Sequence, residues 1–491
     1  MLDGSSSRLA HALQNASLIL LSLLFLPLDT TILFFSLLAK YTLQLPPGRN
    51  GTRTNPSHIR RTVLVTGVGM TKGLVLARLF HQAGHRVVGA DFEPSGSLSP
   101  GRFSNALDVF YRLHKPNSSQ GSAPYLQSLL SIVLKERVDL WVSCSGVASA
   151  VEDGEAKEIL EARTDCKAIQ FDVATTQVLH EKHTFMEHTR EIGLNIPDTH
   201  TVSSRADAYA ALKQAPPGRQ YIMKPIGMDD SARGDMTLLP KKSDSETKKH
   251  LEHLNISKKS QWILQQFIKG KEYCTHSLVI NGKVKAFVAC PSSELLMYYE
   301  ALPLNSALSK AMLSFTEQYA AKAGKGFTGH LSFDFLVEDE SPLDWDEIML
   351  YPIECNPRAH TAVALFNDTP QLVDAYMSLL SGDNVPTSRE PLVTPTQPKQ
   401  YFWLGHDLVE LLIMPFLKTI TGKISPKVFV KDNIAFWNHV LLWRDGTYDL
   451  QDPLPWWCLY HIYWPSQFLS CLITGKKWSR VNVSTLKMFE C

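Results

Sequence analysis

The chain has 491 residues, of which 44% are hydrophobic and 20% charged, and its formal net charge is +1. This composition is typical of a folded globular protein and excludes an extensively disordered chain. The charge lacks the basic excess of nucleic-acid-binding proteins, so no nucleic-acid partner is expected. The length predicts two to four modules at about 100–200 residues each. The eight cysteines are scattered without a C-x-x-C pair, which favours reduced thiols and no zinc site.

The first module, residues 1–58, contains an apolar stretch over residues 17–39 in which Asp29 is the only charge. About 20 apolar residues span a bilayer core, so a membrane segment is predicted. Pro27 and Asp29 in its middle favour a kinked span or a re-entrant hairpin. A cleaved signal peptide is the alternative, but the stretch is too long and no small-residue cleavage site follows. A buried core helix fits less well still.

Basic residues cluster after this segment, whereas only Arg8 precedes it. The downstream residues are Lys40, Arg49, Arg53, Arg60 and Arg61. By the positive-inside rule, the large C-terminal part is expected to face the cytosol from a membrane-associated chain. Residues 44–57 are rich in Pro, Gly, Asn and Thr and are predicted to form a linker.

Residues 59–171 carry a βαβ pattern. A β-branched strand over 62–66 is followed by a glycine-containing turn over 67–73, a helix over 74–83 and a strand over 86–91. A helix over 125–135 and a strand over 139–144 are expected next. The pattern predicts a Rossmann-like parallel sheet.

Residues 172–385 alternate strands and helices, and residues 386–491 form an aromatic-rich C-terminal region. The whole is therefore expected to combine α/β and α+β architecture behind the membrane segment. Aromatic belts favour a membrane interface, so this last region is either an interfacial amphipathic structure or a small domain packed on the core.

The glycine turn, from Gly67 to Gly73, is one candidate nucleotide site. Such turns bring backbone N–H groups to a phosphate at a helix N-terminus, and Asp91 ends the next strand where an NAD ribose ligand would lie. On its own this favours an NAD-dependent oxidoreductase. A glycine turn also serves tight packing of a strand on a helix, so the motif is weak.

A stronger constellation lies downstream and is ordered along the chain. Two lysines come first, then a Gly-x-Glu turn, a strand with an inward Asp, and Glu-x-Asn-Pro-Arg. The residues are Lys182, Lys224, Glu272, Asp334, Glu354, Asn356 and Arg358. Any one lysine is usually a solvated surface residue, but chance assembly of the ordered set is improbable.

Nucleotide chemistry explains why these residue types occur together. Two lysines on separate elements can hold the α- and β-phosphates of ATP, and Glu272 can accept from the ribose hydroxyls. Adenine needs backbone donors and acceptors, which the segment of Gln265, Gln266, Phe267 and Ile268 can supply. Magnesium, or manganese, prefers hard oxygen ligands, and Asp334, Glu354 and Asn356 offer them. The two-residue period of a strand points both side chains of Glu-x-Asn to one face.

In this order and spacing the residues resemble the ATP-grasp superfamily. The resemblance implies a Rossmann-like pre-grasp domain over residues 60–170, whose glycine turn need not bind NAD, and a grasp domain with ATP between two α+β lobes. Homodimers are common in that superfamily.

A closer resemblance concerns the ligases that join an amino acid to a cyclohexenone core in mycosporine biosynthesis, of the mycosporine-glycine synthase type. It is carried by residues 267–277, 70–72, 84–88, 353–360 and 452–455 and by the apolar N-terminus. The loop Pro225–Gly234 departs from that pattern, because it carries Asp229 and Asp230 where the chain should close over the phosphates.

The expected activity is ATP-dependent ligation with release of ADP and phosphate. An acceptor carboxylate or enol takes the phosphoryl group, and an amine or amino acid then displaces phosphate. Arg358 is expected to steady the phosphate or intermediate, and His276 and His360 are candidates on the substrate side. The alternatives are an amino-acid ligase of an alkaloid or peptide-like cluster, an NAD-dependent oxidoreductase, and a non-catalytic membrane scaffold that keeps a grasp fold.

Overall fold

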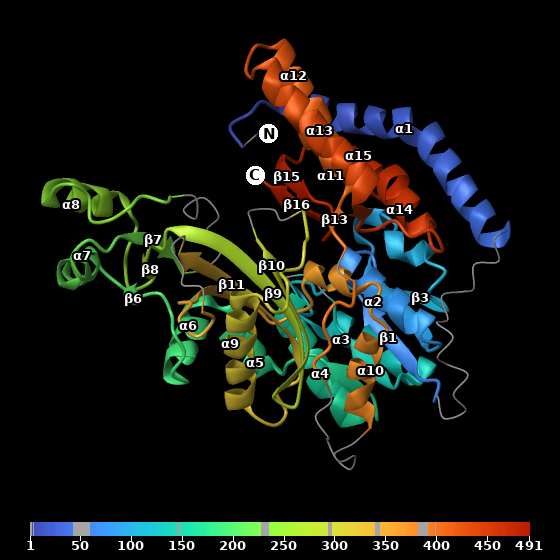
Figure 1. Ribbon diagram of the computed structural model, residues 1–491, viewed down its shortest axis with the longest axis horizontal. Coiled ribbons are helices and arrows are strands. Elements are labelled where there is room, and N and C mark those ends of the chain that lie inside the picture. The colour runs from blue at the N-terminus through green and yellow to red at the C-terminus, as the bar shows by residue number, and fades with distance from the viewer. Residues whose placement is uncertain are drawn as a thin grey trace.

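The computed structural model describes residues 2, 4–42, 59–144, 146, 149–226, 235–292, 297–338, 344–381, 391–397 and 399–491. The predicted linker and the loop over residues 227–234 lie outside this description. The chain combines a parallel sheet, two antiparallel sheets and a mainly helical C-terminal region (Figure 1). The predicted mixed α/β class is thereby confirmed.

The chain begins with one long helix, α1 (Arg8–Thr42). Within the described residues it is the one helix long and apolar enough to cross a membrane. It lies against the C-terminal helices rather than apart from the protein (Figure 1). The predicted apolar segment is therefore helical, and it is longer than the apolar stretch of the sequence.

The parallel sheet predicted from the βαβ pattern is present. Its strands are β1 (Thr62–Thr66), β2 (Arg86–Phe92), β3 (Val109–Leu113), β4 (Leu140–Val142) and β5 (Lys167–Ile169), in the order β3-β2-β1-β4-β5. The helices around it are α2 (Thr71–Gln82), η1 (Pro94–Gly96), η2 (Pro100–Phe103), α3 (Ala123–Glu136) and α4 (Ala150–Arg163).

Both faces of this sheet are covered, as parallel sheets require. Val63 and Val65 share a core with α2, whereas the alternate residue Leu64 packs with α3 and α4. The two-residue period of the strand thus sends neighbouring side chains into two separate cores.

A small antiparallel lobe follows, with sheet order β6-β8-β7. Its elements, with the two helices that lead to it, are α5 (Val173–His180), α6 (Lys182–Glu191), β6 (Thr199–Val202), α7 (Arg205–Gln214), β7 (Tyr221–Pro225), α8 (Asp244–His253) and β8 (Trp262–Gln266). The strands share an apolar core of their own with α7 and α8.

The second antiparallel sheet is larger and has the order β10-β9-β11-β12. Its elements are β9 (Gly270–Ile280), β10 (Lys283–Pro291), α9 (Ala307–Ala323), β11 (Gly329–Glu338), β12 (Tyr351–Asn356), η5 (Thr361–Phe366), α10 (Gln371–Met377) and η6 (Ser378–Leu380). Helix α9 packs on one face, and η5 joins the other face to the core of the parallel sheet. Only a short segment separates β8 from β9, so the two antiparallel sheets meet where the predicted nucleotide residues lie.

The C-terminal region wraps back over the first domain. Its elements are β13 (Tyr401–Phe402), α11 (Leu404–Asp407), η7 (Leu408–Ile413), α12 (Met414–Ile420), α13 (Pro426–Leu442), β14 (Arg444–Asp445), α14 (Leu454–Cys458), η8 (Leu459–Tyr463), α15 (Trp464–Thr474), β15 (Trp478–Asn482) and β16 (Lys487–Glu490). Trp403, Trp464 and Trp478 are buried in the core shared with the parallel sheet. Buried Arg78 of α2 forms a 2.9 Å ion pair with buried Asp452. These parts of the region therefore pack on the first domain, and the expected membrane interface stays a prediction.

Candidate active site

The residues predicted to bind nucleotide and metal come from both antiparallel sheets. We call Lys182, Lys224, Glu272, Asp334, Glu354 and Asn356 the six-residue set. Lys224 ends β7 of the small lobe, and Lys182 opens α6. Glu272 lies on β9, Asp334 on β11, and Glu354 and Asn356 on β12. The chain thus brings residues spread over more than 170 positions to the junction of two sheets.

The three predicted metal ligands are neighbours on adjacent strands. Asp334 and Glu354 stand opposite each other in the antiparallel register of β11 and β12. The amide of Asn356 donates a hydrogen bond to Asp334 Oδ2 at 3.0 Å. Side chains opposite each other in such a pair lie about 5 Å apart at Cβ, close enough to share one ion. The register therefore explains how two separate motifs converge.

The electrostatics of these carboxylates indicate a cation site. Burial, followed by repulsion from Glu354 and Glu272, raises the pKa of Asp334 to about 8. For Glu354, burial alone would raise the pKa, but Lys182 and Arg358 outweigh it and hold the pKa below its usual value. Oxygen ligands crowded at one point suit Mg²⁺, whose charge would offset their repulsion. The residues thus fit the predicted ion.

The two lysines lie close to this carboxylate group. Lys182 Nζ lies 2.8 Å from Glu354 Oε2, and Lys224 Nζ donates to Gln265 Oε1 at 2.9 Å. Burial and repulsion from Lys182 lower the pKa of Lys224 to about 8, against the attraction of Glu354 and Glu272. The lysines and carboxylates therefore act on one another as a single charged site.

The segment predicted to hold adenine is partly occupied by the fold itself. The N–H groups of Gln266 and Phe267 donate to the carbonyls of Asp198 and Gln220, each at 2.7 Å. Those two N–H groups donate to the protein's own chain and are not available to a base. The expectation that every N–H group of the segment could serve adenine is therefore wrong for these two. For Ile268 N–H, no partner occurs among the hydrogen bonds of the described residues. The prediction therefore narrows to Ile268 as the backbone donor.

Glu272 retains a position suited to a ribose hydroxyl. It is half-buried next to the segment just described, and Ser292 donates to its Oε1 at 2.7 Å. Gln265 is buried, and its side chain contacts Lys224 rather than solvent. Gln265 therefore serves to position a lysine, a role that the sequence did not indicate.

Arg358, His276 and His360 lie together behind the metal ligands. Burial lowers the pKa of Arg358 from its usual value, and its Nη1 has no hydrogen-bond partner among the described residues. The ring of His276 is fully buried, and its Nδ1 accepts from His360 N–H at 3.3 Å. His360 Nδ1 accepts from Ala362 N–H and caps η5. Arg358 is thus available to an anion, whereas both histidines have structural contacts, and their substrate roles remain predictions.

Lys72 lies next to the candidate site, and the sequence did not single it out. It lies at the start of α2, is buried, and donates from Nζ to the carbonyl of Ala359 at 3.0 Å. Burial, followed by repulsion from Arg358, lowers its pKa to about 7. The sequence does place this lysine at the start of a largely apolar helix, and that position could have indicated a buried charge. It links the first domain to the Arg358 region.

A second group of potential metal ligands includes Asp334. Cys274, Asp334 and His360 have potential ligand atoms within 4.8 Å of one another. A contact with Cys290, whose Sγ lies at 3.3 Å, and burial hold the pKa of the Cys274 thiol well above its usual value. Without a metal the Cys274 thiol therefore keeps its proton, and His360 Nδ1 accepts a hydrogen bond from Ala362 N–H. The absence of a zinc site therefore stays a prediction.

The glycine turn that suggested NAD binding is closed by the chain. The Asp91 carboxylate accepts from Gly69 N–H at 2.6 Å, Phe92 N–H at 2.7 Å and Ser99 Oγ at 3.2 Å. Thr71 N–H, at the start of α2, donates to the carbonyl of Ser484 at 3.0 Å. Asp91 therefore positions the turn instead of facing a ribose, and the C-terminal hairpin covers the phosphate position. This geometry argues against the NAD interpretation.

Comparisons with known proteins give structural likenesses only. No protein-family model and no curated protein matches the chain. N5-carboxyaminoimidazole synthetase from Staphylococcus aureus complexed with ADP matches with 15% identity and a TM-score of 0.48 over 73% of this chain and 87% of that chain. The L-amino acid ligase from Bacillus licheniformis matches with 14% identity and a TM-score of 0.43 over 67% of this chain and 79% of that chain. At such low identity, the chemistry has to be inferred from the side chains of the site.

Proposed function

We propose that the protein is an ATP-dependent ligase that releases ADP and phosphate. The observation that carries this proposal is the six-residue set, in which three carboxylates crowd together opposite two lysines from other elements. Such a set provides separate positions for a divalent cation and for the phosphates of a nucleotide. The ordered motif along the sequence and the convergence of its members in space support the same chemistry.

The residues have distinct tasks in this mechanism. Asp334, Glu354 and Asn356 would hold the magnesium or manganese ion, which when bound neutralises charge on the phosphates. Lys182 and Lys224 would hold the α- and β-phosphates, Glu272 the ribose, and Ile268 N–H the adenine edge. The ion pair of Lys182 with Glu354 has to open or widen to admit these ligands. Arg358 has a buried Nη1 without a described partner, and its charge would steady the transferred phosphoryl group.

The reaction proceeds in two balanced steps. An acceptor oxygen, from a carboxylate or an enolised ketone, forms a bond to the γ-phosphorus of ATP while the bond to ADP breaks. The nitrogen of an amine then bonds to the activated carbon, the carbon–oxygen bond breaks, and phosphate leaves while the amine loses a proton to solvent. Catalysis by this chain would consist mainly of positioning and charge stabilisation.

For the substrates, we propose an amino acid as the amine and a cyclohexenone of the mycosporine type as the acceptor. The resemblance of residues 267–277 and 353–360 supports this pairing. The loop that departs from that pattern includes residues 227–234, outside the described part of the chain. An acceptor carboxylate from another secondary-metabolite route is the alternative. We also propose that the site faces the cytosol.

The test is nucleotide turnover by the full chain, purified in detergent because α1 packs on the C-terminal region. ADP and phosphate are measured with magnesium and ATP across a panel of amino acids, acceptor acids and cyclohexenones. Release that depends on one amine–acceptor pair supports the proposal and names its substrates. Release of AMP and pyrophosphate would overturn the phosphoryl-transfer mechanism, and absence of ATP binding would favour a non-catalytic scaffold.

A further inference from the structure

Helix α1 has the reverse of the polarity found in helices of water-soluble proteins. Its four buried residues are all polar or charged, namely His11, Asn15, Asp29 and Ser36. The opposite side exposes a stripe of large apolar side chains. They include Leu9, Leu13, Leu20, Leu24, Leu28, Phe35 and Leu38. A surface helix in water places its apolar stripe on the core and its polar stripe outward. This one requires an apolar surrounding on its outer side.

The polar stripe of α1 is bound to the C-terminal region along the helix. Asp29 Oδ2 lies 2.8 Å from His461 Nε2, near the middle. Trp478 Nε1 donates to Asn15 Oδ1 at 2.8 Å towards one end, and Ser36 Oγ lies 2.7 Å from the Tyr448 hydroxyl towards the other. Crossing a bilayer apart from this region would break these contacts and expose Asp29 to hydrocarbon, which is costly.

The length of α1 leads to the same conclusion. Its 35 residues make a helix of about 52 Å, whereas the hydrocarbon core of a bilayer is about 30 Å thick. Because contacts to the folded region extend from Asn15 to Ser36, the helix stays with the protein over most of its length. A helix held in this way and apolar on its outer side fits in the plane of a membrane surface, not across it.

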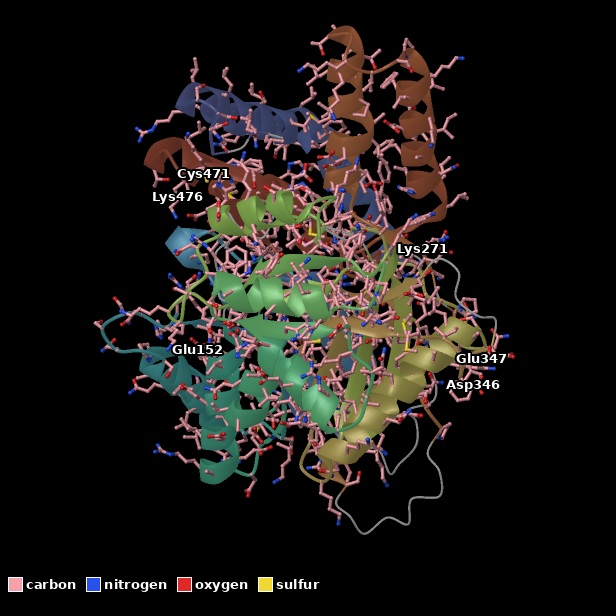
Figure 2. The ribbon with its side chains drawn as sticks, turned by 90° about the vertical axis from the view of Figure 1, so that its left-hand side faces the viewer. Glu152, Lys271, Asp346, Glu347, Cys471 and Lys476 are labelled. Carbon is pink, nitrogen blue, oxygen red and sulfur yellow. The ribbon has the colours of Figure 1, made fainter. Side chains whose placement is uncertain are left out.

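A second apolar surface lies beside α1. Helices α12 and α13 form a hairpin that projects from the molecule at the same end as α1, opposite the end formed by α4 and α10 (Figures 1 and 2). Its exposed large side chains include Phe416, Leu417, Ile420, Val430, Ile434, Trp437, Leu441 and Leu442. A cluster of exposed large apolar side chains of this kind indicates an interaction surface.

Cations accompany the hairpin's apolar side chains. Residues 414–442 contain four lysines, Lys418, Lys423, Lys427 and Lys431, against one carboxylate, Asp432. Basic residues next to apolar ones suit anionic lipid headgroups. A symmetric contact with a second copy would instead bring lysine-rich hairpins together, since the same patch meets itself in a two-fold interface. The charge therefore favours a lipid surface over self-association.

We propose that α1 and the α12–α13 hairpin form a monotopic membrane-binding surface that enters one leaflet of a bilayer containing anionic phospholipid. Helix α1 lies in the plane of the membrane with its polar stripe on His461, Trp478 and Tyr448, and the lysines of the hairpin contact headgroups. The six-residue set belongs to the part of the chain that stays in water. This proposal does not depend on the ligase reaction, because it concerns other residues.

Vesicle flotation of the full chain tests the surface. The chain is mixed with phosphatidylcholine vesicles with or without phosphatidylserine, and we expect flotation that is stronger with phosphatidylserine. Leu24→Gln together with Phe35→Gln should weaken binding by about tenfold or more. Lys418→Gln and Lys427→Gln should each weaken it about fivefold, only on vesicles with phosphatidylserine. Leu134→Gln together with Leu304→Gln changes two exposed leucines in other parts of the chain, is the control, and should float as the unmodified chain does.

Two outcomes of the flotation experiment would overturn the proposal. Unchanged flotation of the α1 double variant would show that its outer stripe does not touch lipid. The unmodified chain could instead fail to float and form oligomers that the Leu24→Gln, Phe35→Gln variant does not form. That result would assign the surface to contact with a second copy. The substituted side chains are exposed, so melting temperatures close to that of the unmodified chain are expected and serve as the folding check.

The orientation of α1 is tested by cysteine labelling. Of the eight cysteines, only Cys491 is exposed, so Cys491→Ser provides a background of low reactivity. Ser5→Cys and Thr42→Cys mark the two ends of α1. In sealed membrane vesicles from expressing cells, an impermeant maleimide should treat both positions alike before and after permeabilisation. Labelling of one end only before permeabilisation would establish a span and overturn the in-plane arrangement.

Discussion

The glycine turn after β1 and the six-residue set are both candidate phosphate sites, and they differ in how their polar groups are satisfied. At the turn, Asp91 accepts hydrogen bonds from Gly69, Phe92 and Ser99, and Ser484 accepts from the first turn of α2. At the set, burial and the neighbouring carboxylates raise the pKa of Asp334. Next to the set, the guanidinium of Arg358 has a buried nitrogen without a partner among the described residues. The polar groups of the turn have their hydrogen-bond partners without a ligand, whereas a bound cation and nucleotide would offset the charges at the six-residue set.

This difference shows that a motif and a site are separate properties. Glycines permit close backbone approach, but the approaching group at the turn is the protein's own chain. A Cβ on Gly69 would lie 2.4 Å from Ser99 Oγ and 3.1 Å from Leu486. The glycine is therefore required for packing, which was the simpler interpretation of the sequence. Uncompensated charge identifies a binding region more reliably than loop shape does.

The largest expected effect comes from Glu354→Gln. The change keeps the size of the side chain but removes one charge from the metal ligands, so turnover should fall by about 100-fold or more. ADP release under saturating ATP measures it. The melting temperature should stay close to that of the unmodified chain. Undiminished turnover in a folded variant would exclude Glu354 from the metal site.

The next effect is on ATP affinity. Lys224→Met should raise the dissociation constant for ATP about 10- to 100-fold, because hydrogen bonds to charged groups contribute about 1.5–3 kcal/mol. Calorimetric titration with ATP and magnesium measures it. Lys72→Met is the matched control, since Lys72 is also a buried lysine but lies behind the Arg358 region. Equal losses in both variants would remove the distinction between the two regions.

At the turn, the expected effect is on stability alone. Asp91→Asn places an amide where the carboxylate accepts from Gly69 N–H, so the free energy of unfolding should fall by about 1–3 kcal/mol. Denaturant unfolding measures it, and the affinity for ATP should not change. Loss of ATP binding in the folded variant would instead show that the glycine turn contributes to the nucleotide site.

The smallest effect is a pH dependence. The pKa of Lys72 is about 7 in the folded chain against 10.5 for an ordinary lysine. Between these values the unfolded chain binds the additional proton, so this residue makes stability rise with pH above 7, by at most about 1.4 kcal/mol per pH unit. Lys72→Met should flatten the rise of the melting temperature between pH 7 and 9. An unaltered slope would mean that Lys72 keeps its proton in the folded protein.

Much of the fold follows from local patterns. The strands and helices predicted between residues 62 and 144 are present with bounds close to those predicted, because their periodicity is a property of neighbouring residues. The sequence also predicts that Asp334 and Glu354 share a site, because both lie on predicted strands and both offer oxygen ligands for one metal ion. The antiparallel register that makes them neighbours could not be deduced from sequence spacing.

Other features depend on partners that are remote in sequence. The burial of Lys72 requires Ala359, and closure of the glycine turn requires Ser484. The hydropathy of α1 suggested a span or a hairpin. The pattern alone does not show that Asp29 pairs with His461, or that Asn15 accepts a hydrogen bond from Trp478. Periodicity marks two faces of a helix but does not say which face meets the protein.

The pairing of α1 with the end of the chain also sets an order of events during synthesis. Asp29 and His461 are 432 positions apart. At about 5–20 residues per second, the ribosome needs roughly 20–90 s to make the second after the first. During that interval the helix has emerged while its polar stripe has nothing to bind. The contacts that hold α1 therefore form only after the region around His461 has also left the ribosome, long after the helix itself.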